Sequence, residues 1–374
     1  MNIGLLGFGA MGKTHTYSVK NLPFFYGAGY ENDKIVALCS GHYENAVKAV
    51  NEFSLGRACK SEDEIINDPN IDIVDICTPN IYHYETVKKA LNAGKHVYCE
   101  KPLAVTYEEA KELCNLAEGK GLTCRIVFNN RFMPAVMRAK EIVESGRLGN
   151  VITFRVAYLH ASCIDPNKKA GWKQDRDICG GGVLFDLGSH AIDLVRHLCG
   201  EIASVSGRSQ IYHKNRLGVD GKAWETNADE AFYITAELEN GGMGTIEANK
   251  LAIGTNDDLS FEIYGEKGAL KYSLMQPNYL RYYDGDRAGG VLGGDGGFTD
   301  IECVGRYPAP GGIFPSFKAP VGWLMGHVES YRDFLDAIKK GSVSKPDFKD
   351  GARVQLIMEK AYESADNGSV DIRV

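Results

Sequence analysis

The chain has 374 residues, of which 44% are hydrophobic and 24% charged, a composition typical of a soluble globular protein long enough for two domains. Its net charge of −7, with no lysine or arginine block, argues against a nucleic-acid partner. We find neither a continuous apolar run of membrane-spanning length nor a signal peptide, and therefore expect no membrane association. The ten cysteines form no CxxC pair, which favours reduced thiols in a cytoplasmic protein and no metal site.

Short apolar strands alternate with helical patterns over residues 1–125. The expected strands are 3–6, 34–39, 71–77, 96–99 and 122–128, and the expected helices are 10–20, 43–53, 61–66, 82–92 and 107–118. Ser61 with Glu64 and Thr106 with Glu109 have capping-box spacing, and Gly94 and Gly121 stand where helices should end. This pattern predicts a doubly wound α/β domain of the Rossmann type, with a parallel sheet covered on both faces.

Strand signals dominate residues 126–374. The expected strands are 151–160, 202–212, 228–239, 242–252, 259–264 and 269–273, with one helix at 183–198. We predict a second α+β domain here, with a largely antiparallel sheet that carries the substrate. The Gly- and Pro-rich stretch 284–320 is expected to be a long functional or mobile loop, and helices 326–340 and 351–366, which could return to the first domain, close the chain.

A glycine-rich turn follows the first strand directly and opens the first helix. Its residues are Gly7, Phe8, Gly9, Ala10, Met11 and Gly12. Gly7 permits a tight turn, Gly9 lets the backbone approach a pyrophosphate, and Gly12 lets the helix pack close to the strand. Because a helix N-terminus offers free N–H groups to phosphates, we interpret the turn as a dinucleotide-binding loop rather than a plain glycine turn.

Two further strand ends carry candidate cofactor residues, because ligands of doubly wound sheets bind beyond the carboxyl ends of the strands. The third strand is followed by Thr78, Pro79, Asn80 and His83, although a plain β–α turn started by Pro79 would explain them equally well. The fourth strand ends in Glu100, Lys101 and Pro102. There Lys101 can hold a substrate hydroxyl and pass a proton, and Pro102 fixes the backbone and admits a cis peptide bond. The alternative for Lys101 is a solvated surface lysine.

The glycine block 180–182 precedes Asp186, His190 and Asp193. Asp186 and His190 are four residues apart on the expected helix and share a face, and Asp193 lies one turn beyond. A carboxylate and an imidazole that reach one hydroxyl suit proton removal during hydride transfer. A helix-surface hydrogen bond is the alternative, whereas a metal site lacks a third ligand at a recognisable spacing.

The chain resembles the Gfo/Idh/MocA family (glucose–fructose oxidoreductase, inositol dehydrogenase) nearly end to end. The resemblance rests on five motifs that occur in this order: the glycine loop, Thr78-Pro79-Asn80 with His83, Glu100-Lys101-Pro102, the run from Asn129 to Pro134, and the block GGGxxxDxGxHxxD. The resemblance implies an open-faced antiparallel sheet in the second domain and redox chemistry on a secondary alcohol of a sugar, cyclitol or glycoside. It also implies that Lys101, Asp186 and His190 are the catalytic residues, while Glu100, Lys101 and Asn129 join the expected cofactor contacts.

The position after the second strand, where an acidic residue often binds the adenosine ribose, is not acidic in this chain. Asp33 has the generic spacing from the glycines but precedes the second strand, so Ser40 occupies the acidic position after that strand. Serine would admit a 2′-phosphate, yet no basic residue follows before Lys48. The sequence therefore leaves NAD and NADP open, with NAD favoured.

Several aromatic residues are further substrate candidates. Trp172 could stack on a sugar face, and Tyr158 or His160 could reach the substrate from the end of a strand, although each could equally pack in the core. His327 and Trp323 are candidates only if the long loop covers the pocket.

We expect an NAD(P)-dependent oxidoreductase in which His190 exchanges the hydroxyl proton, Lys101 polarises the oxygen, and Asp186 orients the substrate and His190. The roles of Lys101 and His190 could be exchanged. Two alternatives stay open: an NAD-dependent glycosidase that works by oxidation and elimination, and a non-catalytic dinucleotide sensor, which would not need the three residues. An open-faced sheet would also be buried in a homodimer or homotetramer.

Overall fold

The computed structural model describes residues 1–304, 314, 316 and 318–374, and these divide into two compact units. Of the described residues, the first unit comprises 1–129, 314, 316 and 324–355, and the second comprises 130–304, 318–323 and 356–374. Helix α10 (Phe348–Asp366) therefore contributes its first residues to one unit and its remainder to the other.

The first unit is built on a parallel sheet with the strand order β3-β2-β1-β4-β5-β6. Its strands are β1 (Asn2–Leu6), β2 (Lys34–Cys39), β3 (Arg57–Cys59), β4 (Ile73–Ile76), β5 (His96–Cys99) and β6 (Cys124–Ile126). Its helices include α1 (Ala10–Tyr26), α2 (Tyr43–Phe53), α3 (Asp63–Ile66), α4 (His83–Asn92) and α5 (Tyr107–Lys120). This order is that of the Rossmann fold, and the central strands β1, β4 and β5 are almost wholly buried, as a sheet covered on both faces requires.

The predicted helix signals of this unit hold with one exception. Thr106 and Glu109 form a complete capping box at the start of α5, and Gly121 ends that helix in the left-handed conformation. The predicted Ser61–Glu64 box is wrong: the helix begins two residues later, at Asp63, and Glu64 accepts the N–H of Lys60 instead. The short strand β3 was missed because Arg57–Cys59 has too few residues for a pattern.

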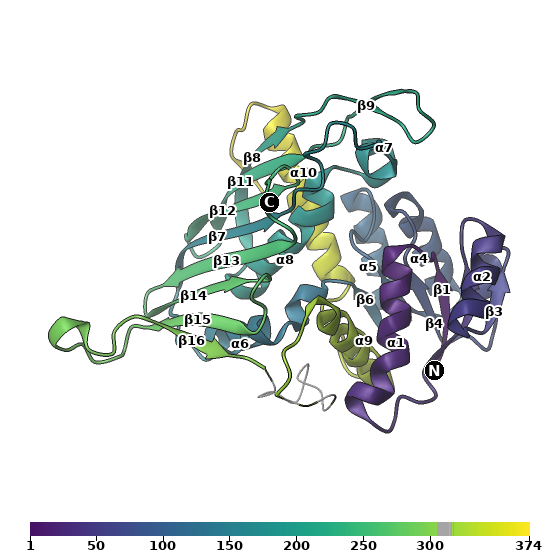
Figure 1. Cartoon of the computed structure of the whole chain (residues 1–374), viewed down its shortest axis with the longest axis horizontal. Coiled ribbons are helices and arrows are strands. Elements are labelled where there is room, and N and C mark those ends of the chain that lie inside the picture. The colour runs from purple at the N-terminus through teal and green to yellow at the C-terminus, as the bar shows by residue number, and fades with distance from the viewer. Residues whose placement is uncertain (305–313, 315, 317) are drawn as a thin grey trace. The chain divides into compact units, whose positions relative to one another are not determined.

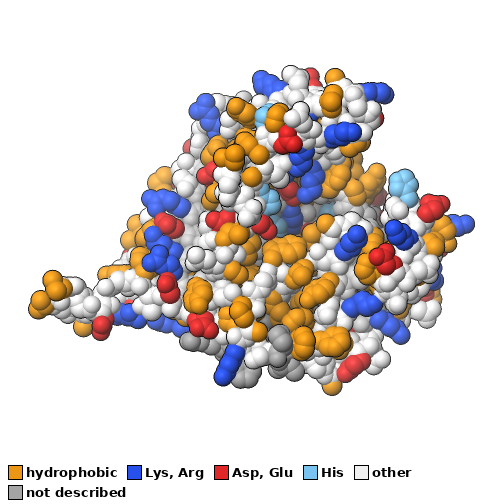
Figure 2. All heavy atoms as spheres, in the orientation of Figure 1, with side chains coloured by type: hydrophobic (Ala, Val, Ile, Leu, Met, Phe, Trp, Pro, Cys, Tyr) orange, Lys and Arg blue, Asp and Glu red, His pale blue; other side chains and the backbone are white. Residues whose placement is uncertain are grey.

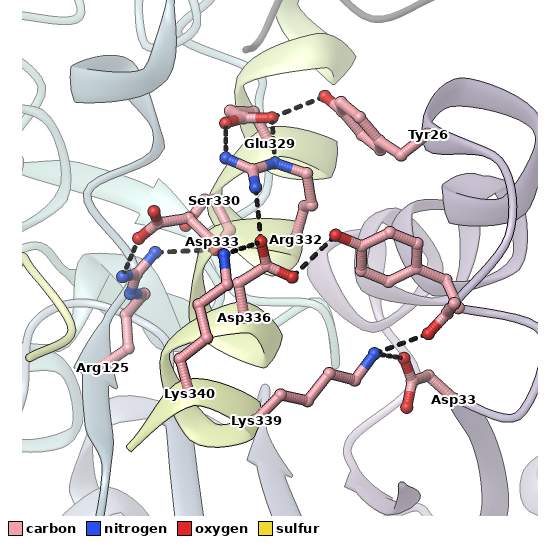
Figure 3. A network of polar contacts seen from close by, with 12 residues as sticks. Tyr26, Asp33, Arg125, Glu329, Ser330, Arg332, Asp333, Asp336, Lys339 and Lys340 are labelled. Carbon is pink, nitrogen blue, oxygen red and sulfur yellow. Dashed lines mark hydrogen bonds and ion pairs between the residues drawn. The ribbon is translucent and has the colours of Figure 1, made fainter. Parts of the chain in front are cut away.

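Helix α9 (Trp323–Lys340), far along the chain, belongs to the first unit from Leu324 on, and Figure 3 shows the polar contacts that hold it there. Arg125 on β6 is fully buried and donates to the carbonyl of Ser330 at 2.7 Å and pairs with Asp333. Tyr26 at the end of α1 donates to Glu329 at 2.6 Å. These contacts fix α9 against elements that precede it by some 200 residues or more.

The second unit contains a mixed, mostly antiparallel sheet with the order β16-β15-β14-β13-β7-β12-β11-β8-β17, in which only β7 and β12 pair in parallel among the described strands. The strands are β7 (Val151–Leu159), β8 (Ile202–Gln210), β11 (Ala231–Leu238), β12 (Met243–Asn249), β13 (Asp258–Gly265), β14 (Gly268–Ser273), β15 (Tyr279–Asp284), β16 (Phe298–Glu302) and β17 (Ile372–Arg373). The short strands β9 (Asn215–Leu217) and β10 (Ala223–Glu225) form a separate pair. Helices α6 (Pro134–Glu144) and α8 (Ser189–Leu198) pack on the large sheet (Figure 1), whose outward residues alternate with buried ones, and α7 (Arg176–Cys179) precedes α8.

The stretch 284–320 is only partly the structureless loop that we predicted. It contains β16, which pairs with β15, and the hairpin between them projects from the edge of the second unit's sheet (Figure 1). Val291 and Leu292 are almost wholly exposed in this hairpin, and Figure 2 shows apolar side chains at its tip. Residues 305–313, 315 and 317 of the predicted loop lie outside the described part of the chain.

Helical residues 176–198 are long and apolar enough to cross a membrane by composition, but 83% of the qualifying window is buried inside the protein. They form the helical core of the second unit, since α8 packs against β7 and β12. No other helix among the described residues meets that test. All ten cysteines are described, and none of them forms a disulfide.

Candidate active site

The glycine loop has the geometry of a dinucleotide-binding turn. Gly7 has a φ of +92°, and a Cβ there would lie 2.5 Å from the carbonyl oxygen of Cys77. A Cβ on Gly12 would lie 2.2 Å from the carbonyl oxygen of Gly7, so the fold itself requires both glycines. At Gly9 a Cβ would meet no protein atom within 4 Å, and Gly9 gives α1 no side-chain cap. The space at Gly9 can therefore admit a phosphate, and the uncapped N–H groups at the start of α1 can donate hydrogen bonds to it.

Other predicted cofactor residues lie at the carboxyl ends of the strands of the same sheet. Thr78 follows β4, and its hydroxyl oxygen is buried without a hydrogen-bond partner among the described residues. The side-chain nitrogen of Asn129, beyond β6, is also buried without such a partner. Because buried polar groups are rarely left unsatisfied, these two atoms fit the contacts that a bound dinucleotide would complete.

His83 joins the two predicted strand-end turns. Its Nδ1 lies 2.7 Å from the carbonyl oxygen of Pro102, and its Nε2 lies 2.9 Å from that of Thr78. Burial lowers the pKa of His83, and hydrogen bonds to the two carbonyls oppose this shift. The Lys101–Pro102 bond is cis, as its position allowed us to expect. His83 thus holds these turns together within the protein, and Asn80 beside it is buried.

Four further members of the predicted cofactor set, Phe8, Ala10, Met11 and Ser40, are half-buried or exposed. Ser40 follows β2 and is half-buried, while Gly41 and His42 are exposed. Asp33 forms ion pairs with the amino group of Met1 and with Lys339. Phe8 packs on Phe53 with ring centroids 5.5 Å apart, and Ala10 and Met11 begin α1.

In the second unit, Asp186 lies between two lysines. The predicted helix 183–198 is a π-helical turn (Leu184–Gly188) that continues into α8, a distortion common at functional sites. Within it, Asp186 pairs with Lys250 at 2.7 Å and with Lys173 at 3.1 Å. Lys250 is buried, and although burial lowers its pKa, the charge and hydrogen bond of Asp186 outweigh burial and raise it. The two ammonium groups beside Asp186 therefore favour the ionised form of this carboxylate.

His190 lies on α8 with only 7% of its surface exposed. Its Nδ1 is 3.4 Å from the side-chain nitrogen of Asn130, and its ring meets that of Tyr158 edge-on, with centroids 5.8 Å apart. One turn further on, Asp193 receives two hydrogen bonds from Arg131. Asp193, which shares a face with the two candidate catalytic residues of this helix, thus forms an ion pair that holds Arg131 against α8.

Tyr158 and His160 share a carboxylate that sequence reasoning missed. His160 Nε2 lies 2.7 Å from Asp257, which also receives a hydrogen bond from Tyr158. Burial opposes ionisation of Asp257, but these two bonds and the nearby imidazoles of His160 and His190 outweigh it and lower the pKa of Asp257. Burial, followed by the charge of Asp257, raises the pKa of the Tyr158 phenol.

Strand pairing explains how these distant residues meet. Asn249 on β12 pairs with Leu159 on β7, which in turn pairs with Asp258 on β13. The residues just beyond these three positions, namely His160, Lys250 and Asp257, therefore lie side by side at the ends of three neighbouring central strands. No sequence motif marks Lys250 or Asp257, because only the register of the sheet brings them to Tyr158 and His190.

The glycine block before this site is required by packing. A Cβ on Gly182 would lie 2.2 Å from backbone atoms of Asp229, whose carboxylate accepts the N–H groups of Gly182 and Leu184, each at 3.0 Å.

The other aromatic substrate candidates differ in burial. Trp172, just before the block, is 39% exposed, whereas His327 is buried on α9 in the first unit, near His15. Trp323 is the half-buried first residue of α9.

Residues 1–128 match a family model described as an oxidoreductase family with an NAD-binding Rossmann fold, and residues 136–271 match the GFO/IDH/MocA C-terminal domain. The chain is 31% identical to levoglucosan dehydrogenase of Pseudarthrobacter phenanthrenivorans over 98% of its own length and 96% of that protein. The chain belongs to the Gfo/Idh/MocA family of oxidoreductases.

Two further comparisons agree with this assignment to the Gfo/Idh/MocA family. A structure of levoglucosan dehydrogenase in complex with NADH and levoglucosan superposes with a TM-score of 0.94 at 30% identity, covering 100% of this chain and 99% of that one. D-glucoside 3-dehydrogenase of Escherichia coli is 25% identical over 90% of this chain and 89% of that protein. As a Gfo/Idh/MocA protein, the chain is an NAD(P)-dependent oxidoreductase that acts on CH–OH groups, and the open space at Gly9 and the unsatisfied Thr78 and Asn129 fit that cofactor.

Proposed function

We propose that this enzyme transfers a hydride between the nicotinamide and a secondary hydroxyl of a sugar, cyclitol or glycoside, with Lys101, Asp186 and His190 as its catalytic residues. The observation that carries the proposal is the polar cluster of the second unit, where the imidazole of His190 and the lysine-paired carboxylate of Asp186 lie near the phenol of Tyr158, at the end of β7. Bound NAD(P) supplies the hydride acceptor, or the donor in the reverse direction. The chain's own residues have to bind the hydroxyl and move its proton.

His190 is proposed to exchange that proton at Nε2. An imidazole accepts a proton at Nε2 only when Nδ1 carries the other hydrogen. The amide of Asn130 lies beside Nδ1, and its oxygen, buried without a partner among the described residues, accepts that hydrogen when the amide is turned by a half rotation. Asn130 would thereby select the tautomer in which His190 acts as a base.

Asp186 is proposed to bind the substrate rather than to move the proton. Its two lysine partners stabilise the carboxylate, which accepts hydrogen bonds from sugar hydroxyls without becoming protonated. Lys101, which follows β5, polarises the reacting oxygen. The exposed ring of Trp172 offers a surface for the C–H face of a sugar.

The relatives named levoglucosan dehydrogenase and D-glucoside 3-dehydrogenase support a pyranose-type substrate. The test is to incubate the protein with NAD or NADP and a panel of anhydrosugars, glycosides, free sugars and inositols, and to follow absorbance at 340 nm with product analysis. We expect net reduced cofactor with a pyranose, and a higher kcat/KM with NAD than with NADP. Glycoside cleavage without net reduced cofactor would instead indicate the glycosidase alternative, and cofactor binding without turnover of any substrate would indicate a sensor.

We also propose that the second-unit sheet pairs with that of another copy in a homodimer or homotetramer. Its outward face exposes Tyr233 and Met243, with exposed fractions of 41% and 54%, and carries a cavity of about 560 Å³ lined by Glu262, Lys271 and Arg281 among others. Light scattering at micromolar concentration should give at least the mass of a dimer, and Met243→Glu should lower it. A monomeric wild-type mass contradicts the proposed assembly.

The ten reduced thiols support a cytoplasmic location.

A further inference from the structure

A buried chain of polar side chains lies behind the strand end that carries Lys101. His15, on α1 three residues after Gly12, has its Nδ1 2.8 Å from Asp75 on β4 and its Nε2 3.1 Å from Glu100 after β5. The side chains of His15 and Asp75 are wholly buried, and that of Glu100 is 8% exposed. Both imidazole nitrogens therefore have a carboxylate partner inside the first unit.

The chain of contacts continues at both ends. The second oxygen of Asp75 accepts the hydroxyl of Tyr331 on α9 at 2.9 Å. The second oxygen of Glu100 lies 3.3 Å from the backbone nitrogen of Lys101, which donates to it. Glu100 thus connects the imidazole directly to the backbone of the proposed catalytic lysine.

The contact with Asp75 favours the doubly protonated ring. Burial disfavours a charged imidazole, but the charge of Asp75 and the hydrogen bonds with Asp75 and Cys77 outweigh it and raise the pKa of His15 well above its ordinary value. The rings of Tyr98, Tyr331 and His327 surround it, with centroids 5.2, 6.0 and 6.1 Å away. Two groups of side chains lie close enough together to hold a metal ion, His15 with Glu100 and His327, and His15 with Asp75 and Cys77. Both nitrogens of His15 already lie within hydrogen-bond distance of carboxylate oxygens, and Cys77 Sγ lies 3.1 Å from Nδ1.

Buried ion pairs contribute little net stability, because desolvation offsets their attraction. A fully buried imidazole between two carboxylates is better explained by a need to hold particular groups in place. The contacts of His15 link the helix that begins at the cofactor loop with two adjacent strand ends. Of these, only Glu100 leads on to a residue that the proposed function uses.

We propose that His15 is a positioning residue for catalysis: through Glu100 it fixes the backbone at Lys101 and ties that residue to the helix of the cofactor loop. This inference rests on the proposed role of Lys101. A displacement of about 1 Å in a reacting group can lower a rate by about a hundredfold. The loss of the Glu100 contact should therefore slow hydride transfer more than it weakens cofactor binding.

Two conservative variants separate the two contacts of His15. In His15→Asn the amide nitrogen stands near the position of Nδ1, so the Asp75 bond can persist while the Glu100 bond is lost. In His15→Gln the amide nitrogen stands near the position of Nε2 and can still donate to Glu100. We expect His15→Asn to lower the single-turnover hydride-transfer rate by at least about tenfold, on the scale of a misplaced reacting group, and His15→Gln to recover most of it. NAD(H) affinity should stay within about threefold in both variants, because α1 keeps its free N-terminal amides.

The control is His96→Ala, at the other end of β5. Nδ1 of His96 accepts the N–H of Thr123 at 3.0 Å, so this variant also removes an imidazole from the same strand. It should lower the melting temperature without changing the hydride-transfer rate per folded molecule. A purely structural role for His15 would give the same result as this control.

A double-mutant cycle tests whether His15 acts through Lys101. His15→Asn should slow the wild-type enzyme but cause no further loss in the Lys101→Ala background. Equal losses in both backgrounds, or equal rates for His15→Asn and wild type beside an impaired Lys101→Ala, would overturn the inference and leave the proposed function intact. A wild-type rate in Lys101→Ala would instead overturn the role proposed for that lysine.

Discussion

The ammonium group of Lys250 lies 2.7 Å from a carboxylate oxygen of Asp186, and this lysine is buried, whereas Lys173, 3.1 Å from the same carboxylate, is 47% exposed. The carboxylate of Asp186 thus has one buried and one solvent-exposed lysine partner. Because a buried charge pair is screened much less than an exposed one, Lys250 should dominate the stabilisation of ionised Asp186.

The first prediction compares these two lysines. Lys250→Met should reduce transition-state stabilisation by about 1.5–3 kcal/mol, the scale of a lost charge-assisted hydrogen bond, measured as the change in kcat/KM. Lys173→Met should cost at most about 1 kcal/mol, as expected for an exposed pair. Similar losses in the two variants would mean that burial of Lys250 has no part in substrate binding.

The second prediction concerns the cofactor loop. Gly9→Val should leave the melting temperature nearly unchanged, because a Cβ at Gly9 meets no protein atom within 4 Å. It should lower NAD(H) affinity by at least about tenfold, or about 1.4 kcal/mol, by titration calorimetry. Gly12→Val is the contrast, since its Cβ would collide with the carbonyl oxygen of Gly7 and should destabilise the fold. Unchanged NAD(H) affinity in folded Gly9→Val would exclude this loop as the phosphate site.

Local patterns predicted the first unit well. The strands at 34–39 and 96–99 and the helix at 43–53 have the predicted bounds, since each is a short, strongly patterned segment between turn residues. Helix α6 and strand β16, both in the second unit, were not predicted, and β16 lies in a glycine-rich stretch without strand periodicity.

Motifs likewise identified only some of the site. Lys101, Asp186 and His190 belong to recognisable runs, but Lys250, Asp257 and His15 do not. Asp257 reaches His160 through the pairing of β13 with β7, a contact between residues 97 positions apart. His15 reaches Glu100 across 85 positions by the packing of α1. Contacts of this kind are set by the tertiary fold and leave no local periodicity to read.

The third prediction is a pH dependence of stability. The pKa of Asp257 is lowered in the folded protein, so its ionised form contributes stability that is present above the unfolded value of about 3.9 and is lost as pH falls through the folded value below it. Wild type should therefore exceed Asp257→Asn in melting temperature between about pH 5 and 7, and the gap should close below about pH 4. Because Asp257 is 41% exposed, the gap should correspond to at most about 1 kcal/mol.

The control for this pH dependence is Asp286→Asn, in the exposed stretch after β15. It should show little difference from wild type at any pH in the same range. If the melting-temperature gap for Asp257→Asn widened as the pH fell, the lowered pKa of Asp257 in the folded protein would be wrong.

The most direct test of the catalytic assignment is single-turnover hydride transfer in Lys101→Ala and His190→Ala, measured with cofactor affinity and melting temperature on the same preparations. The account predicts that each variant loses at least about a hundredfold in rate, the scale of a missing acid–base group, while NAD(H) affinity changes far less. Lower stability with a wild-type rate per folded molecule would mean that both residues are structural. Wild-type hydride-transfer rates in both variants would contradict the mechanism.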